Sequence, residues 1–421
     1  MFQYLRLDGL WRHPDFVKLW AGHTVSLAGS LVSRFALPLV AIISLDASPG
    51  EVALIRMADA LPGVVLGLVA GVWVDRLRRR PLMIWSDIGR AVLLAWIPLA
   101  AVLGWLGIWQ LFFVVMAAGT LTALFEVANR SYLPTLISRD QLVEGNSKLS
   151  AAGSVVEVAA FGFAGLLVQL LTAPVAMLLD AVSFVVSALC IGAISKPEPP
   201  VRVVEQEQST LAAIREGLRL VFGDPILRAI AGARATSEFF LYIWVTMLLV
   251  FLTRDLELEP LVFGVLFAIG GVCSFFGALV AGRVEHWLGL GPTLVATFFI
   301  STAALLTVPL AAGPFVLVIF LVGVQQLADA PATIFQIHEE SLVQAAVPDE
   351  TLGRVTASLR VMGWAAMLAG TVAGGVLGEV IGPRLTMLVG AVGTLPAALW
   401  LLMSPVRRLR SLADVQPTAA R

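Results

Sequence analysis

Eight ionisable side chains interrupt long apolar stretches of this sequence, and their chemistry is the first clue to what the chain does. A charged group is costly inside a membrane, so each of these residues is a candidate for binding a substrate or carrying a proton. The eight candidates are Arg34, Asp59, Arg90, Glu157, Asp180, Arg234, Glu238 and Asp329.

Glu157 and Arg90 are predicted to lie near the middle of the membrane. Counted from the cytoplasmic ends of their stretches, a helical rise of about 1.5 Å per residue places them about 13 Å and about 12 Å deep, in a hydrocarbon core about 30 Å thick. Desolvation disfavours a carboxylate there and an arginine favours it, a balance that lets an acid gain and lose a proton near neutral pH. Glu157 is therefore a candidate proton carrier, and the alternative is a permanently paired structural glutamate.

Arg34 and Asp59 are predicted to share the outer third of the membrane. The same rise places Arg34 roughly 24 Å from the cytoplasmic end of its stretch and Asp59 roughly 10 Å from the external end of the next. They form either a pair that faces the substrate and gates its path or a structural pair that neutralises itself.

Arg234 and Glu238 are four residues apart, hence on one face of a helix and able to pair with each other. If they instead face a cavity, Glu238 lies at a depth comparable with that of Glu157. Asp180 is expected in the outer third of its stretch, and Asp329 in the inner third of its own beside Gln325 and Gln326. Both aspartates either line a pathway or satisfy local backbone groups.

Motifs for catalysis are not found in the chain. It contains no H-E-x-x-H, no G-x-S-x-G and no Walker A sequence, so we predict that it is not an enzyme and needs no cofactor or metal. The run His338-Glu339-Glu340 has no second histidine at metal spacing and is interpreted as a solvated loop segment. Without an ATP-binding loop, the energy for any transport must come from an ion gradient, by default of protons, or from the substrate's own gradient.

The elements that must position these residues are membrane helices. Hydrophobic residues make up 58% of the 421 residues and charged residues 14%, far outside the usual composition of soluble proteins. A span needs about 20 mainly apolar residues. Twelve stretches meet this requirement: 17–43, 52–74, 82–104, 108–128, 149–171, 174–194, 229–252, 260–282, 289–311, 314–336, 355–378 and 383–404.

The positive charges predict the orientation. Of the 28 Lys and Arg residues, we assign two to external loops, four to spans and the remainder to the cytoplasmic side, with both termini cytoplasmic.

The chain is predicted to divide into two halves of six spans each, at 1–194 and 225–404, with a cytoplasmic tail at 405–421. The cytoplasmic linker between the halves, 195–224, begins with a Pro-rich part and ends with an amphipathic segment. An offset of 210 residues aligns landmarks of the halves, among them Asp75 with Glu285, which indicates duplication.

The segment GVWVDRLRRRPL at 71–82 forms a tight basic loop between two spans. It resembles the signature G-x-x-x-D-R-x-G-R-R-x of the major facilitator superfamily, with Arg78 at the second glycine position. The matching residues are Gly71, Asp75, Arg76, Arg79 and Arg80. The wider chain is similar to the bacterial branch of that superfamily that contains the enterobactin exporter and macrolide-efflux proteins.

The resemblance implies an all-α membrane protein with twelve transmembrane helices in two pseudo-symmetric six-helix bundles. It also implies that the basic loop latches the two halves on the cytoplasmic side, where we expect Glu126 to join Asp75 and the arginines. The G-P-x-x-G signature of the branch is present as Gly162-Phe163-Ala164-Gly165, without its proline. Function as a monomer is usual for the superfamily.

Together these features predict a secondary transporter of the bacterial inner membrane. It would act as an antiporter, exporting an amphipathic small molecule such as a drug, macrolide or siderophore-like compound in exchange for protons by alternating access. The predicted partners are the small-molecule substrate, protons and the lipid bilayer, with no nucleic acid. An importer or facilitator on the same fold is the first alternative, and a membrane sensor without transport is the second.

Overall fold

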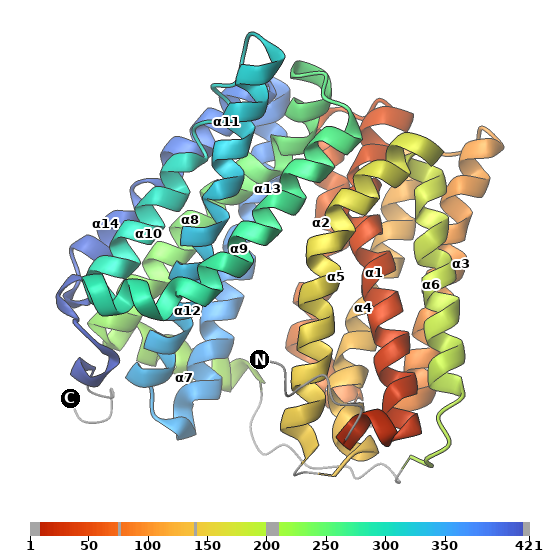
Figure 1. Ribbon diagram of the computed structural model, residues 1–421, viewed down its shortest axis with the longest axis horizontal. Helices are drawn as coiled ribbons and strands as arrows, with labels where there is room; N and C mark the ends of the chain where they lie inside the picture. The colour runs from red at the N-terminus through yellow and green to blue at the C-terminus, as the bar shows by residue number, and fades with distance from the viewer. Residues whose placement is uncertain (1–8, 75–76, 139–140, 199–209, 416–421) are drawn as a thin grey trace. The chain divides into compact units, whose positions relative to one another are not determined.

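The computed structural model describes residues 9–74, 77–138, 141–198 and 210–415, and over these ranges the chain folds into helices joined by short connections (Figure 1). The chain forms two compact units. The first unit contains residues 1–47 and 58–205, and the second contains 48–57 and 206–421.

The first unit is a bundle in which α1 packs against α5 and α6, while α3 packs against α4 and α6. Figure 1 shows α5, α1 and α6 running side by side. The helices are α1 (Pro14–Leu39), most of α2 (Pro49–Val74), α3 (Arg79–Val102), α4 (Ile108–Leu136), α5 (Leu142–Leu171) and α6 (Ala173–Gly192). One end of the bundle is filled by apolar side chains that include Phe16, Met83 and Tyr132.

The second unit is built around the packing of α13 on α8, with α9 and α10 against α12. Its helices are α7 (Thr210–Gly223), α8 (Pro225–Val250), α9 (Pro260–Leu288), α10 (Leu290–Ala304), α11 (Phe315–Leu327), α12 (Asp329–Ala346), α13 (Asp349–Thr394) and α14 (Ala397–Leu402). The amphipathic segment α7 lies on α13, where Arg354 Nη1 is 2.5 Å from Glu216 Oε1 and the Ser358 hydroxyl donates to Ile214 O.

Within the described residues, eight helical segments are long and apolar enough to span a membrane. A ninth is added if the bent pair Leu142–Glu157 and Gly162–Leu171 is one span. The predicted all-helical membrane class is therefore confirmed, while the count of twelve stays a prediction. Two differences from the expected spans are local: α10 has 15 residues, and α13 joins the last two expected spans across a kink at Gly382.

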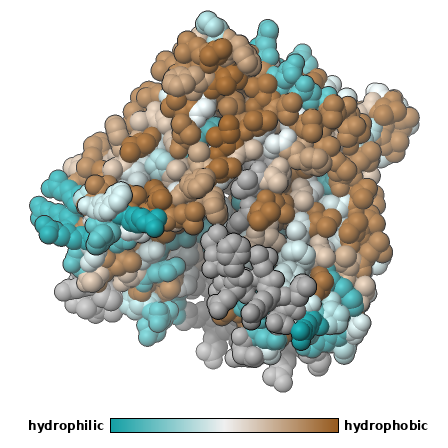
Figure 2. Space-filling view, viewed as in Figure 1, coloured by the Kyte–Doolittle hydropathy of each residue, from teal (hydrophilic) through white to brown (hydrophobic). Residues whose placement is uncertain are grey.

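Hydrophobic side chains cover much of the visible face of the second unit, and hydrophilic ones gather towards the last turns of the chain (Figure 2). Large apolar residues of the second unit are strongly exposed, including Val316 at 79% and Trp287 at 77%. An apolar surface of this extent is unfavourable in water and is expected where a protein faces lipid.

One interpretation from the sequence is wrong. His338 and Glu339 do not lie in a solvated loop; they lie within α12 and are only 3% and 8% exposed. Three successive polar residues lower the hydropathy of this stretch, which hides the fact that a helix can turn two of them inward and leave Glu340 exposed.

Candidate functional site

The first unit contains a buried ion pair between Asp87 and Arg90, both on α3. The Arg90 Nη2 group donates to Asp87 Oδ1, and the two residues are 3% exposed or less. Their spacing of three residues places them on one helical face, so a single helix forms the pair. The sequence predicts a similar depth for Arg90 and Glu157, and the structure gives Arg90 a partner on its own helix.

Two aromatic rings enclose the Arg90 guanidinium. Its central carbon lies 4.0 Å from the centroid of the Phe184 ring on α6 and 4.5 Å from that of Phe125 on α4. A planar, weakly hydrated guanidinium stacks well on such faces, and the attraction to the ring quadrupole grows when water is excluded. Arg90 therefore contacts side chains of α3, α4 and α6, while the opposite charge that pairs with it lies on α3.

Asp180 is buried at 1% exposure where α6 meets α1. Its carboxylate accepts a hydrogen bond of 3.0 Å from the Ser183 hydroxyl. Gly29 allows α1 to lie close to these two side chains, because a Cβ atom there would lie within 2.6 Å of Asp180 Oδ1 and of the Ser183 hydroxyl oxygen. The predicted acid of the sixth span is thus placed at a close crossing of two helices.

The second unit has a looser charge cluster that connects two helices. Arg234 Nη1 on α8 lies 3.9 Å from Glu339 Oε1 on α12, with the Arg234 side chain 38% exposed and that of Glu339 10% exposed. Glu238 lies one turn along α8 and interacts electrostatically with Arg234. Sequence reasoning paired Arg234 with Glu238, and the structure brings Glu339 into ion-pairing distance.

A second buried polar contact follows directly along α12. His338 Nδ1 lies 2.7 Å from the carbonyl oxygen of Ile334, and His338 Nε2 lies 3.1 Å from Glu285 Oε2 on α9. Glu285 is the residue that the repeat offset aligns with Asp75 of the basic loop. It thus anchors a contact between α9 and α12.

Asp329 begins α12 and lies against α9. A Cβ atom at Gly270 would lie within 2.5 Å of Asp329 Oδ2 and Gln326 Oε1, so glycine lets both side chains approach α9 without moving aside. Gln326 is buried and donates to Gln325 Oε1 at 2.6 Å. The predicted neighbourhood of Asp329 with the two glutamines is therefore present in the structure.

The basic loop can be followed in part. Glu198 accepts from the backbone amides of Arg79 and Arg80, and the Arg80 guanidinium donates to the carbonyls of Ile191 and Gly192 at the end of α6. A cation at a helix C-terminus is favoured by the partial charge of the unpaired carbonyls. Asp75 and Arg76 lie outside the described residues, as do the surroundings of Gly71.

The remaining predicted residues have exposed side chains: Arg34, Asp59, Glu126 and Glu157. An exposed side chain in a membrane protein contacts lipid, headgroups or a water-filled path. The role of Glu157 as a proton carrier stays a prediction.

Sequence reasoning missed Asp87, Glu339 and His338. A signal for Asp87 was available in the three-residue spacing to Arg90. No comparable signal marks Glu339, because its partner is more than a hundred residues away in the chain.

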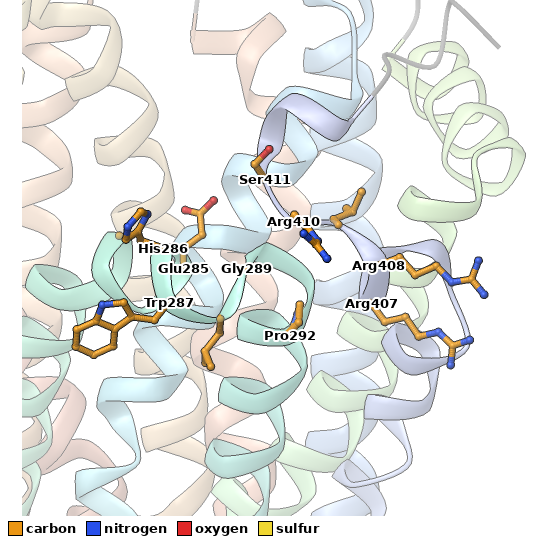
Figure 3. Close-up of a pocket in the computed structure, with 12 residues that line it drawn as sticks. Glu285, His286, Trp287, Gly289, Pro292, Arg407, Arg408, Arg410 and Ser411 are labelled. Carbon is orange, nitrogen blue, oxygen red and sulfur yellow. The ribbon is translucent and has the colours of Figure 1, made fainter.

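A pocket with a volume of about 770 Å³ opens at the end of the second unit where α9 meets α10 and the last turns of the chain. Figure 3 shows Glu285 and His286 on α9, with Arg407 and Arg408 extending away from them. The chain after α14 holds the start of α10, because Leu290 and Gly291 donate their amides to the carbonyls of Arg410 and Leu409. The described residues contain no group of three or more His, Cys, Asp or Glu side chains arranged to hold a metal ion.

Comparison with known families decides the class of protein. A family model described as "Transmembrane secretion effector" matches residues 10–420. The chain belongs to this family. The resemblance to major facilitator transporters and to macrolide-efflux proteins is thereby confirmed.

Three relatives of the chain show what this family contains. The chain is 25% identical to the MFS-type transporter YfiS of Bacillus subtilis over 88% of each chain. It is 28% identical to the multidrug efflux pump Tap of Mycolicibacterium fortuitum, over 90% of this chain and 92% of the pump. It is 24% identical to macrolide efflux protein A of Streptococcus pyogenes, over 49% of this chain and 51% of that protein.

Solved structures give the fold. A bacterial homologue of the iron transporter ferroportin in an inward-facing state superposes with a TM-score of 0.75 at 18% identity, over 94% of this chain and 99% of that one. The nucleoside transporter NupG superposes with a TM-score of 0.72 at 12% identity, over 92% and 98%. This family member is thus a multi-pass membrane transporter with a major facilitator fold.

Proposed function

We propose that this transporter exports an amphipathic small molecule in exchange for protons. Alternating access would be provided by two pseudo-symmetric six-helix bundles, with twelve spans in total, acting as a monomer in the bacterial inner membrane with cytoplasmic termini. Two of its relatives are named as efflux pumps for drugs or macrolides. Those names support export, and they describe the relatives.

The observation that carries proton coupling is the cluster of Arg234, Glu238 and Glu339. A buried glutamate 3.9 Å from a partly exposed arginine has its charge only partly compensated. Taking up a proton removes the cost of burying the carboxylate, and losing the proton restores the ion pair. Because the pair joins α8 to α12, its protonation can be coupled to a movement between helices.

The other predicted residues keep their places in the proposal. Glu157 supplies an exposed acid in the first unit, Arg34 with Asp59 and Asp180 with Asp329 line the proposed pathway, and Arg90 supports it structurally. The basic loop and Glu126 form the proposed latch, of which the anchoring of Arg79 and Arg80 is described above.

The decisive experiment uses inverted membrane vesicles that contain the full chain. An imposed pH gradient, acid inside, should drive accumulation of a lipophilic cationic dye or of a macrolide, and addition of the compound should release protons from the vesicles. We expect Glu339→Gln to abolish the response to the gradient, because an amide can neither bind the coupled proton nor pair with Arg234. Glu340→Gln is the matched control, since Glu340 is the exposed neighbour on the same helix.

Other results would change the proposal. Unaltered gradient-driven accumulation in Glu339→Gln together with its loss in Glu157→Gln would transfer the carrier role to Glu157. Accumulation only with the gradient reversed would indicate import, and binding of the compound without flux in proteoliposomes would indicate a sensor.

A further inference from the structure

The His338 ring has a hydrogen-bond acceptor at each of its two nitrogens. Nδ1 lies 2.7 Å from the carbonyl oxygen of Ile334, and Nε2 lies 3.1 Å from a carboxylate oxygen of Glu285. A carbonyl oxygen has no proton to give, so Nδ1 must carry one and donate it. The position of that first proton is therefore fixed by the backbone of α12.

The contact with Glu285 then requires a second proton. A neutral imidazole with its proton on Nδ1 presents a lone pair at Nε2, and a carboxylate also presents lone pairs, so the two would repel each other. One additional proton between Nε2 and Oε2 turns this repulsion into a hydrogen bond. Imidazole is intrinsically the stronger base of the two, which places that proton on the ring.

The position of Glu285 also favours a cation beside it. Glu285 lies three residues before the end of α9 at Leu288, where the partial charge of the last carbonyls is negative. A carboxylate is disfavoured at this end of a helix, and an imidazolium at 3.1 Å compensates for it.

Water can deliver the proton. Glu285 lines the pocket at the end of the second unit (Figure 3). Its side chain is 27% exposed, whereas the His338 side chain is only 4% exposed. The carboxylate thus connects the pocket to a buried ring. A proton arriving at Glu285 needs to move by a single hydrogen bond to reach Nε2.

The elements packed on α12 contribute further charge. Helices α10 and α11 carry no titratable side chain. Besides His338 and Glu285, the charged or titratable groups on α12 itself, on α8, on α9 and around the turn Leu412–Asp414 are Asp329, Glu339, Glu340, Arg228, Arg234, Glu238, Tyr242, Cys273, Arg283, His286, Arg410 and Asp414. Glu339, the buried neighbour of His338, has Arg234 as its own cation at 3.9 Å, so it does not compete with Glu285 for the imidazolium.

From this geometry we propose that His338 and Glu285 form a proton-binding site that is filled from the pocket and holds α9 against α12. The imidazolium donates from Nδ1 to Ile334 and from Nε2 to Glu285. Removal of the proton leaves two lone pairs facing each other and breaks this hydrogen bond between α9 and α12. The site does not depend on the direction of transport or on which acid carries the coupled proton.

Nitrogen NMR of the purified full chain in lipid nanodiscs tests this directly. The chain has four histidines, and the signals are assigned by replacing the other three, His13, His23 and His286, one at a time with glutamine, so that the wild-type site is observed intact. An imidazole in water is protonated in about 3% of molecules at pH 8. We expect His338 to carry protons on both nitrogens in most molecules at that pH, an increase of at least tenfold.

Glu285→Gln is the matched variant at the site. A glutamine amide can donate to a neutral Nε2, so this variant keeps a hydrogen bond without the extra proton. We expect its His338 ring to become neutral at pH 8, with the proton on Nδ1, while His286→Gln leaves the His338 signals unchanged. A neutral His338 ring in the wild-type protein at pH 8 would overturn the proposal, as would a doubly protonated ring that persists in Glu285→Gln.

Discussion

The two units hide positive charge in different ways. In the first, Arg90 is 3% exposed, pairs with Asp87 on its own helix and lies between two phenylalanine rings. In the second, the Arg234 side chain is 38% exposed and reaches across from α8 to Glu339 at 3.9 Å. One arginine is enclosed and paired within its own helix, and the other is partly open and pairs at a longer distance with another helix.

On our proposal, this difference separates a structural role from a functional one. The Asp87–Arg90 pair can stay intact when helices move, because both partners belong to α3. The Arg234–Glu339 pair must stretch or break if α8 and α12 move apart. A transporter needs the second type wherever binding is to be coupled to movement, and the first type wherever a bundle has to stay rigid.

The largest expected effect comes from breaking the enclosed pair. Arg90→Met leaves the Asp87 carboxylate buried without its cation, which typically costs about 3–5 kcal/mol of stability. Thermal unfolding of the purified protein in detergent should therefore show a large loss, with most of it recovered in the double variant Asp87→Leu with Arg90→Met. An equal loss of thermal stability in Arg234→Met would contradict the distinction between an enclosed pair in the first unit and a partly exposed pair in the second.

The next effect concerns function. Glu339→Gln should leave thermal unfolding close to that of the wild type while reducing gradient-driven accumulation in vesicles about tenfold or more, because a membrane-buried acid acts through its charge change. The Asp87–Arg90 pair should matter for stability and not for transport, so the folded double variant Asp87→Leu with Arg90→Met should retain transport. If that double variant has normal stability but does not transport, Asp87 and Arg90 have a direct role in transport.

Smaller effects are expected at the two glycines that allow close approach of an aspartate. Gly29→Ala and Gly270→Ala introduce a Cβ atom within 2.6 Å of side-chain oxygens at Asp180 and Asp329, and such overpacking usually costs about 1–3 kcal/mol. Gly323→Ala is the control, because a Cβ atom there meets nothing within 4 Å, and the change should be neutral or stabilising. Unfolding midpoints of the three variants compare the sites, and unchanged midpoints at both crossings would show that the aspartates can move aside.

Particular residues show what could be predicted. The helical location of Arg90 and Asp180 and the proximity of Asp329 to Gln326 could be predicted, but the sequence did not distinguish these buried charges from the exposed Arg34 and Glu157. The partner of Arg234 could not be derived, because Glu238 at helical spacing and Glu339 on a distant helix are equally good by charge. His338 was misplaced since hydropathy averages over a window and does not register which side of a helix a residue occupies.

The sequence by itself determined that this chain is a helical membrane transporter. Transfer of each side chain from water to lipid is a local property, so a chain with 58% hydrophobic residues in long runs is predicted to form membrane spans, and the resemblance of residues 71–82 to the signature G-x-x-x-D-R-x-G-R-R-x predicts the family. Only the tertiary structure decided which charges meet. Ion pairs and shared protons depend on distances of a few ångströms, and those distances are set by the rotation and crossing of packed helices.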